Sequence, residues 1–127
     1  MIGDIKLFQL ASALTRHSSD RHQVIAQNIA NADTPGYRAK DVEAFSDAVA
    51  RMDRAGQGPA RVNGVPDAVT WRIAADPAAG AVSPNGNSVT LEDQMMKSVE
   101  TEQNHEAATT IYRKAMEILR TSMRSNT

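Results

Sequence analysis

The stretch from Asn28 to Tyr37, N-I-A-N-A-D-T-P-G-Y, ends a long amphipathic segment at the start of the chain. Pro35 disfavours helical backbone angles at the residue before it, and Gly36 readily adopts a positive φ. Proline at the second position and glycine at the third are typical of a type II turn, which we expect over 34–37. The first helix should therefore end just before this turn.

Residues 1–33 carry a stripe at the spacing of an α-helix, with polar side chains on the opposite face. The stripe is apolar at its two ends and polar in the middle, at Ser18 and Arg21. We expect a helix that packs this stripe against another helix, either in the same chain or in a neighbouring subunit. The stripe consists of Leu7, Leu10, Ala11, Leu14, Ser18, Arg21, Ile25, Asn28, Ile29 and Ala32.

A second long helix is expected over 91–123, where Thr90 and Asp93 resemble a capping box at its start. At 3.6 residues per turn, its early and late apolar residues face nearly opposite ways. Either the helix supercoils to keep a 3.5-residue period, or its two halves contact different partners. A heptad pattern gives a seam of Leu91, Met95, Ser98, Glu102, His105, Thr109, Tyr112, Met116, Leu119 and Met123.

The middle segment, 34–90, is rich in glycine and proline, a composition that predicts turns and loops. One short helix is expected within it, over 42–52. Residues 69–73 alternate as a strand does, and Trp71 is expected to dock on the helices. A loop-rich segment of this length is unusual in a compact domain and suggests an extended arrangement.

These patterns predict a mostly α fold. Long N- and C-terminal helices should form an antiparallel hairpin or coiled-coil layer, joined by a loop-rich middle with at most a short strand or hairpin. The expected organisation is an N-terminal helix over 1–33, a middle segment over 34–90 and a C-terminal helix over 91–123.

The composition narrows the class of protein. A chain of 127 residues suits one small domain or one elongated subunit, and an aromatic content of 4 % predicts a thin core. A net charge of −1 with no basic block argues against a nucleic-acid binder. The absence of cysteine excludes disulfides, thiolate zinc sites and a cysteine nucleophile.

The start of the chain does not resemble a cleaved secretory signal, because Asp4 and Lys6 interrupt it and no sufficiently long apolar run follows. No apolar stretch reaches the roughly 18 residues that a transmembrane helix needs.

Catalytic or metal chemistry is not expected. Glu102 and His105 have the spacing of a di-iron ligand pair, but such a site needs a second pair and two more glutamates. His17, Asp20 and His22 in the first helix do not supply them in matching order. No phosphate-binding loop or nucleophile motif is present in the sequence, so we expect no cofactor, no metal and no enzymatic activity.

The combination of a striped N-terminal helix with N-x-A-N-x-x-T-P-G-Y resembles the N-terminal signature of the bacterial flagellar axial proteins. These proteins are the rod, hook and filament-junction subunits. The matching residues are Asn28, Ala30 to Tyr37, and Ala39 to Val42. Ser83 to Asn87, read S-P-N-G-N before the second helix, is a further match. The resemblance covers both ends of the chain and none of the middle.

The resemblance implies a structural subunit of the proximal rod of the flagellar basal body. Its terminal helices would form the inner layer of a shaft that transmits torque from motor to hook, for motility. The implied partners are other rod subunits, the rod–export-gate adaptor protein and the export apparatus, in homo- and hetero-oligomeric helical assembly. It also implies export without a cleaved signal peptide to a location that spans the periplasm, and no nucleic-acid or small-molecule ligand.

The residues expected to carry subunit packing lie in the turn and in the two helical stripes. They are Leu7, Leu10, Leu14, Ile25, Asn28, Asn31, Thr34, Pro35, Gly36, Tyr37, Ile111, Ile118 and Leu119. The alternative is a stand-alone helical-hairpin binding module, with a weak metal site, whose match to the flagellar signature is accidental.

Overall fold

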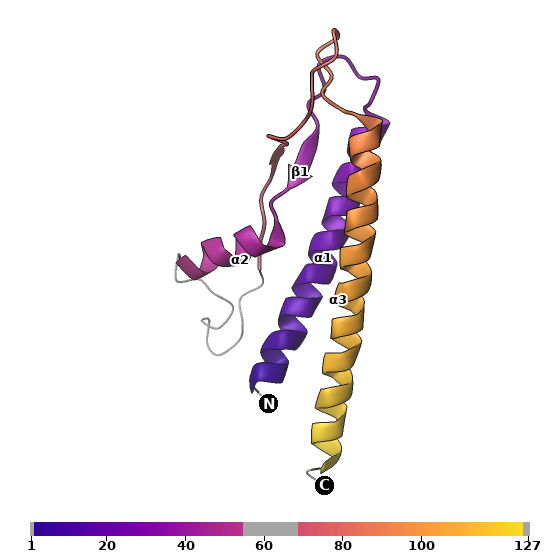
Figure 1. Cartoon of the computed structure of the whole chain (residues 1–127). Coiled ribbons are helices and arrows are strands. Elements are labelled where there is room, and N and C mark those ends of the chain that lie inside the picture. The colour runs from indigo at the N-terminus through magenta and orange to yellow at the C-terminus, as the bar shows by residue number, and fades with distance from the viewer. Residues whose placement is uncertain (1, 55–68, 126–127) are drawn as a thin grey trace.

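A computed structural model describes residues 2–54 and 69–125 of the chain, with side chains from residue 6 onward. Two long helices lie side by side in opposite directions, and the described chain begins and ends at the same end of this pair (Figure 1). A small two-stranded sheet and a short helix lie along the other side of the first helix (Figure 1). The predicted mostly α hairpin is confirmed. The elements are α1 (Ile2–Ala30), β1 (Lys40–Val42), α2 (Phe45–Arg54), β2 (Ile73–Ala75) and α3 (Leu91–Ser125).

The first helix ends at Ala30, and a series of turns follows it. The amide of Asn31 donates to the carbonyls of Gln27 and Asn28, at 3.1 and 3.2 Å. The amide of Thr34 then donates to the carbonyl of Asn31 at 3.0 Å, which tightens the chain before the turn. The regular helix thus stops a few residues before 33.

The middle segment is an antiparallel ladder followed by a short helix. Lys40 pairs with Ala75, and Val42 pairs with Ile73. Because Val42 belongs to this ladder, the short helix begins only at Phe45 and runs to Arg54, instead of spanning 42–52. The second strand likewise starts at Ile73, where the predicted strand over 69–73 ends.

A buried apolar cluster lies where α1 meets the middle segment. Its buried members are Ala13, Ala48, Met52 and Val69, with Phe45, Val49 and Trp71 packed against them. The ring of His17 stands edge-on to Phe45 and Trp71, with centroid distances of 5.6 and 5.2 Å. Trp71 Nε1 donates a hydrogen bond to Asp20 at 2.8 Å, so Trp71 docks on α1 as expected.

The seam of α3 differs from the predicted one. Its buried residues recur every seventh position, as Gln94, Thr101, Ala108 and Ala115, and none of them belongs to the predicted heptad seam. Of the ten predicted seam positions, Leu91, Met95, Glu102 and Met123 are exposed, and the other six are half-buried. Small side chains at the contact allow two helices to approach closely, whereas larger apolar ones would hold them apart. The buried residues of α3 recur every seven residues, which is two turns of 3.5 residues each.

Candidate functional site

One buried amide joins four segments of the chain. Asn28 is only 1 % exposed. Its Nδ2 donates to the carbonyl of Lys40 at 2.7 Å and to Gln94 Oε1 at 3.0 Å. Its Oδ1 accepts from the amide of Lys40 at 3.0 Å and from the Tyr37 hydroxyl at 3.2 Å. All four hydrogen-bonding positions of the amide are therefore used, and α1, the turn, β1 and α3 meet at this side chain.

The predicted turn is present and contacts a second turn. Gly36 has a φ of 76°, and the amide of Tyr37 donates to the carbonyl of Thr34 at 3.2 Å. The amide of Gly36 donates to the carbonyl of Asn85 at 2.9 Å. Gly86 has a φ of 85°, and a Cβ placed on it would lie 3.3 Å from the Cα of Gly36. The backbones of the two turns lie close together at Gly86, and the positive φ at both glycines favours glycine over other residues.

Asn87 holds the second turn against the first. Its Nδ2 donates to the carbonyls of Asn31 and Thr34, both at 2.8 Å. The amide of Ala39 donates to the Ser88 hydroxyl at 2.7 Å. The two sequence motifs that lie far apart in the chain thus form one hydrogen-bonded unit. We call this contact between residues 31–39 and 83–88 the turn clasp.

Below the turn clasp, a cluster of charges ties the middle segment to both long helices. Arg21 Nε of α1 contacts Asp41 Oδ1 of β1 at 3.2 Å. Lys97 of α3 contacts the same Asp41 at 3.5 Å and Asp93 at 3.3 Å, and it forms an ion pair with Asp76 after β2. The side chains of Arg21, Lys97, Asp41 and Asp76 are each at most 20 % exposed. Partial burial makes such ion pairs less screened than pairs on an open surface.

The cluster shifts the acid–base behaviour of its members. Burial alone would lower the pKa of Lys97, but its hydrogen bond to Asp76 and the charges of Asp41 and Asp76 raise the pKa above its ordinary 10.5. Burial would likewise raise the pKa of Asp76. The hydrogen bonds from Lys97 and from the Ala78 amide, with the charge of Lys97, instead lower the pKa below its ordinary 3.8. Both groups are therefore charged at neutral pH.

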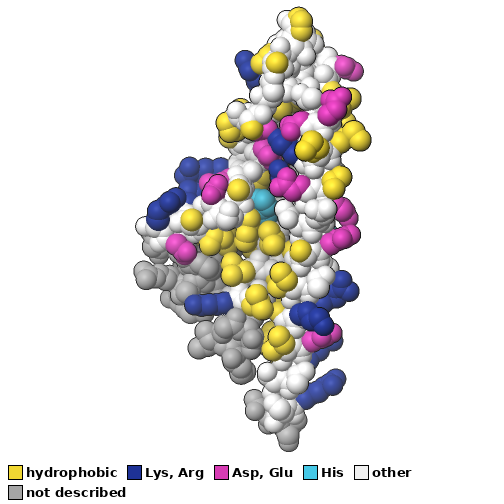
Figure 2. Space-filling model, viewed as in Figure 1, with side chains coloured by type: hydrophobic (Ala, Val, Ile, Leu, Met, Phe, Trp, Pro, Cys, Tyr) yellow, Lys and Arg dark blue, Asp and Glu magenta, His cyan; other side chains and the backbone are white. Residues whose placement is uncertain are grey.

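An apolar groove opens at the other end of the molecule. It has a volume of about 420 Å³ and is bordered by α1, α2 and α3. Hydrophobic side chains gather there in one patch between α2 and α3 (Figure 2). Its apolar lining residues are Leu7, Leu10, Ala11, Leu14, Phe45, Val49, Ala50 and Ile111.

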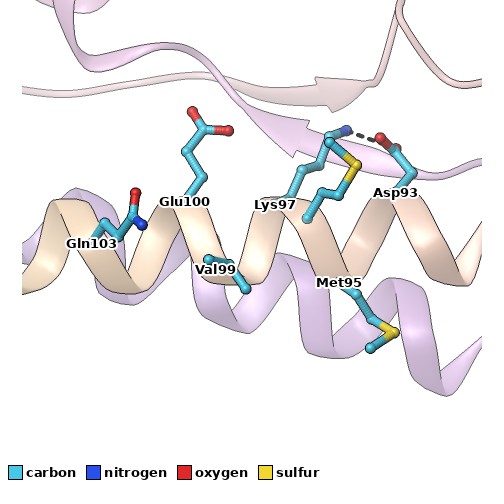
Figure 3. A pocket seen from close by; sticks show the side chains of 7 residues that line it. Asp93, Met95, Lys97, Val99, Glu100 and Gln103 are labelled. Atoms are coloured by element: carbon cyan, nitrogen blue, oxygen red, sulfur yellow. Dashed lines mark ion pairs between the residues drawn. The ribbon is translucent and has the colours of Figure 1, made fainter.

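A second apolar surface lies on the first half of α3. Met95, Met96 and Val99 are 65 %, 73 % and 59 % exposed. Asp93, Lys97 and Glu100 project on the side of the strands, whereas Met95 projects on the opposite side (Figure 3). We call Met95, Met96 and Val99 the α3 ridge. Large apolar side chains at this exposure within one contiguous stretch are typical of a contact surface.

The structure brings the predicted packing residues together in two groups. Asn28, Asn31, Thr34, Pro35, Gly36 and Tyr37 lie in or beside the turn clasp, and Leu7, Leu10, Leu14 and Ile111 line the groove. The remaining three residues lie outside both groups. Ile25 is buried, Ile118 is 44 % exposed and Leu119 is half-buried.

Sequence reasoning missed Asn87, Gln94 and the charge cluster as parts of the site. Asn87 carried a signal, because it closes the S-P-N-G-N match. Gln94 could have been found from its seven-residue spacing to Thr101 and Ala108. The partners of Lys97 are far apart in the chain, and nothing in the local sequence pairs them.

Neither a metal site nor a membrane span is found among the residues that the structure describes. No group of three or more His, Asp or Glu side chains in 2–54 and 69–125 could hold a metal ion. None of the described helices has the length and apolar character needed to cross a membrane.

His22 Nε2 of α1 lies 3.4 Å from a carboxylate oxygen of Glu102 of α3, so this pair links the two long helices.

Two comparisons with known proteins agree with this geometry. A sequence model described as flagella basal body rod protein matches residues 10–38, which span most of α1 and the turn. A curated relative from Agrobacterium fabrum (strain C58) is 36 % identical over 109 residues, covering 80 % of this chain and 81 % of the relative. That relative is named flagellar basal body rod protein FlgB.

Proposed function

The chain belongs to the flagellar basal body rod protein family, and from this premise we propose that it is a subunit of the proximal rod. Family membership makes it a structural component of the flagellar basal body. Beyond that, we propose that its terminal helices assemble side by side into the axial shaft and that this shaft transmits torque from motor to hook. A stand-alone module without a flagellar role is set aside by the family membership.

The distribution of apolar residues on α3 carries this proposal. The residues of α3 that are fully buried are Gln94, Thr101, Ala108 and Ala115, while several large apolar residues of the same helix are exposed. Leu91, Met95, Met96, Val99, Ile111, Ile118 and Met123 are between 38 % and 73 % exposed. A soluble monomer gains nothing from this arrangement, but a subunit whose helix is covered by neighbours does.

The packing residues of the groove and the turn have separate proposed roles. Leu7, Leu10, Leu14 and Ile111 face a neighbouring subunit through the groove. The turn clasp fixes where the middle segment leaves the helical layer. Ile118 extends the apolar surface toward the end of α3, and Leu119 and Ile25 support the helix pair from its inner side.

The proposed partners are other rod subunits, the rod–export-gate adaptor protein and the export apparatus, with export proceeding without a cleaved signal peptide. Cryo-electron microscopy of isolated basal bodies tests the role directly. We expect the α1–α3 hairpin to fit density in the wall at the base of the rod, with the middle segment outside it. Complete rods and normal motility in a strain that lacks the chain would overturn the proposal.

A further inference from the structure

The second turn of the turn clasp contains a pair of residues with a chemistry of its own. Asn85 is exposed, and it is followed by Gly86, which has no Cβ. Deamidation in proteins is fastest where glycine follows asparagine, because no side chain hinders the attack of the glycine nitrogen on the asparagine amide. The side chain of Asn85 is therefore open to a reaction that the proposed role in assembly does not use.

The reaction needs only hydroxide and water. The backbone nitrogen of Gly86 loses its proton to hydroxide and attacks Cγ of Asn85. A bond forms between this nitrogen and Cγ, the Cγ–Nδ2 bond breaks, and the leaving nitrogen takes a proton from water to give ammonia. Water then adds to one of the two carbonyls of the resulting succinimide ring. Opening at Cγ leaves aspartate at position 85, whereas opening at the main-chain carbonyl leaves isoaspartate, in which the peptide bond runs through the former side chain.

In the folded chain, the turn clasp holds the groups that would react. The N–H of Gly86 donates to the carbonyl of Ser83 at 2.8 Å, so the attacking nitrogen would lose a hydrogen bond together with its proton. Asn85 Oδ1 accepts from the amide of Asn87 at 3.1 Å. The main-chain carbonyl of Asn85 accepts from the amide of Gly36 at 2.9 Å. Because ring closure breaks at least the first of these bonds, the closed clasp disfavours the reaction.

We propose that Asn85 is a deamidation site protected by the closed turn clasp, and that a chain with an open clasp ages into a form that cannot close it. Isoaspartate makes the main chain one carbon longer between Ser83 and Asn87, whose amide and carbonyl are joined at 2.9 Å. It also turns the carbonyl that accepts from Gly36 into a free carboxylate. The aspartate product keeps the original main chain and a side-chain oxygen for the Asn87 amide. Isoaspartate should therefore disrupt the clasp, whereas aspartate should preserve it.

Peptide mapping by mass spectrometry tests the protection on the purified full-length chain. The chain is incubated at mildly alkaline pH, either folded in buffer or unfolded in concentrated urea, and the products at position 85 are measured over time. We expect deamidation to be at least about tenfold slower in buffer, because the reaction then follows the small fraction of chains with an open clasp. Equal rates in buffer and in urea would overturn the proposal.

The sequence contains an internal reference for the rate in urea. Asn63 and Gly64 form its other Asn-Gly pair and lie outside the residues that the structure describes. In urea, Asn63 and Asn85 should deamidate at similar rates, because the same chemistry then acts without a fold. Reaction at Asn63 without reaction at Asn85 in urea would contradict the assignment of Asn85 as a deamidation site.

Asn87→Ala opens the clasp without changing the reacting pair. It removes the group that donates to the carbonyls of Asn31 and Thr34. In buffer, we expect this variant to deamidate at position 85 at least about threefold faster than the unaltered chain, because its clasp is open more often. In urea, the two chains should react at the same rate.

Asn104→Ala is the matched control, since Asn104 is an exposed asparagine of α3 away from the clasp. It should leave the rates in buffer and in urea unchanged. Ser88→Ala, which removes the acceptor of the Ala39 amide, is a second way to open the clasp if circular dichroism shows that Asn87→Ala does not fold. A clasp variant that folds and deamidates no faster than the unaltered chain would overturn the protection.

The reaction products test the second half of the proposal. A chain with Asn63→Gln, in which position 85 is the only Asn-Gly pair left, is aged in urea. The aspartate and isoaspartate forms are then separated and returned to buffer. We expect the isoaspartate form to melt at a clearly lower temperature than the aspartate form, and equal melting temperatures would contradict the role of the clasp. Each measurement uses the purified chain, so its outcome is independent of the proposed place in the rod.

Discussion

At the scale of single residues, the turn clasp depends on a few side chains and on two glycines with positive φ. Asn28 uses two donors and two acceptors at once, and Asn87 bridges two carbonyls. Gly36 and Gly86 allow two turns with positive φ to touch. Buried polar groups cost free energy unless they are fully paired, so each of these residues is sensitive to change.

We predict that Asn28→Ala lowers the free energy of unfolding by about 2–4 kcal/mol. The substitution leaves the side-chain oxygen of Gln94 and the backbone N–H and C=O of Lys40 without their partner. Chemical denaturation followed by circular dichroism measures the change. Gln27→Ala is the matched control, since Gln27 is the exposed neighbour on the same helix. Equal stability of the two variants would contradict the role given to Asn28.

The two glycines should differ in their tolerance of alanine. Gly36→Ala places its Cβ in open space, so we predict only the strain of a positive φ, about 1 kcal/mol. Gly86→Ala adds a contact of 3.3 Å with the backbone of Gly36, and its loss of stability should be clearly larger. Gly80→Ala, whose Cβ would meet Thr90 at an ordinary 3.8 Å, serves as control. Thermal melting gives the order of stability. A Gly36→Ala variant that melts at a lower temperature than Gly86→Ala would refute this ranking.

At the scale of elements, the sequence was sufficient for the helices and the first turn but not for which face of α3 meets α1. The T-P-G-Y stop and the helical stripes depend on local rules, and they were predicted. The heptad seam failed because the apolar residues were assumed to lie inside, whereas Gln94, Thr101, Ala108 and Ala115 lie there. A helix with large apolar residues on more than one face gives no pattern that distinguishes the face that meets α1 from the exposed one.

The close approach of α1 and α3 predicts a sharp difference between two neighbouring alanines. Ala108 is fully buried in the seam, whereas Ala107 is exposed. Ala108→Leu should therefore force the helices apart and lower the free energy of unfolding by about 1–3 kcal/mol. Ala107→Leu is the matched control and should change it by less than about 0.5 kcal/mol. Denaturant titration of both variants decides this, and similar curves would argue against the observed seam.

The charge cluster predicts a defined dependence of stability on pH. The pKa of Asp76 is lower in the folded chain than its ordinary 3.8, so its contribution is present above that value. It is lost as the pH falls through the folded pKa. The pKa of Lys97 is raised, so its contribution is present below 10.5 and is lost as the pH rises through the folded value.

Replacing Asp76 by Asn should remove the part of the acid transition that this carboxyl causes. We expect the free energy of unfolding to fall at neutral pH and to depend less on pH below about 4 than in the unaltered chain. Asp33→Asn, at an exposed position in the turn region, is the control and should keep the original slope. Parallel acid titrations by circular dichroism measure the pH dependence of stability in both variants. An unchanged dependence in the Asp76 variant would exclude this carboxyl as a main cause of the acid transition.

At the scale of the whole molecule, α3 leaves several large apolar residues exposed while its fully buried residues are small or polar. The buried apolar cluster lies beside the middle segment, and α3 buries Gln94, Thr101, Ala108 and Ala115, with Tyr112 stacked on Phe8 of α1 at 4.6 Å. Large apolar residues of α3 remain outside. Hydrophobic stabilisation scales with the apolar area removed from water, so these exposed residues add little to the stability of a single chain and would add more if the proposed neighbours covered them.

This division predicts that stability depends on protein concentration. Binding of a second copy to the folded state stabilises it by mass action, so the melting temperature of the purified chain should rise with concentration. A variant with Met96→Gln and Val99→Gln should match the unaltered chain when dilute, because both residues are exposed in the single molecule. At high concentration it should lack the increase, because a polar ridge no longer gains from leaving water. Thr110→Gln, which lies on the same stripe outside the ridge, should keep the increase. A melting temperature that is independent of concentration for all three chains would show that this apolar face is covered by something other than copies of the chain.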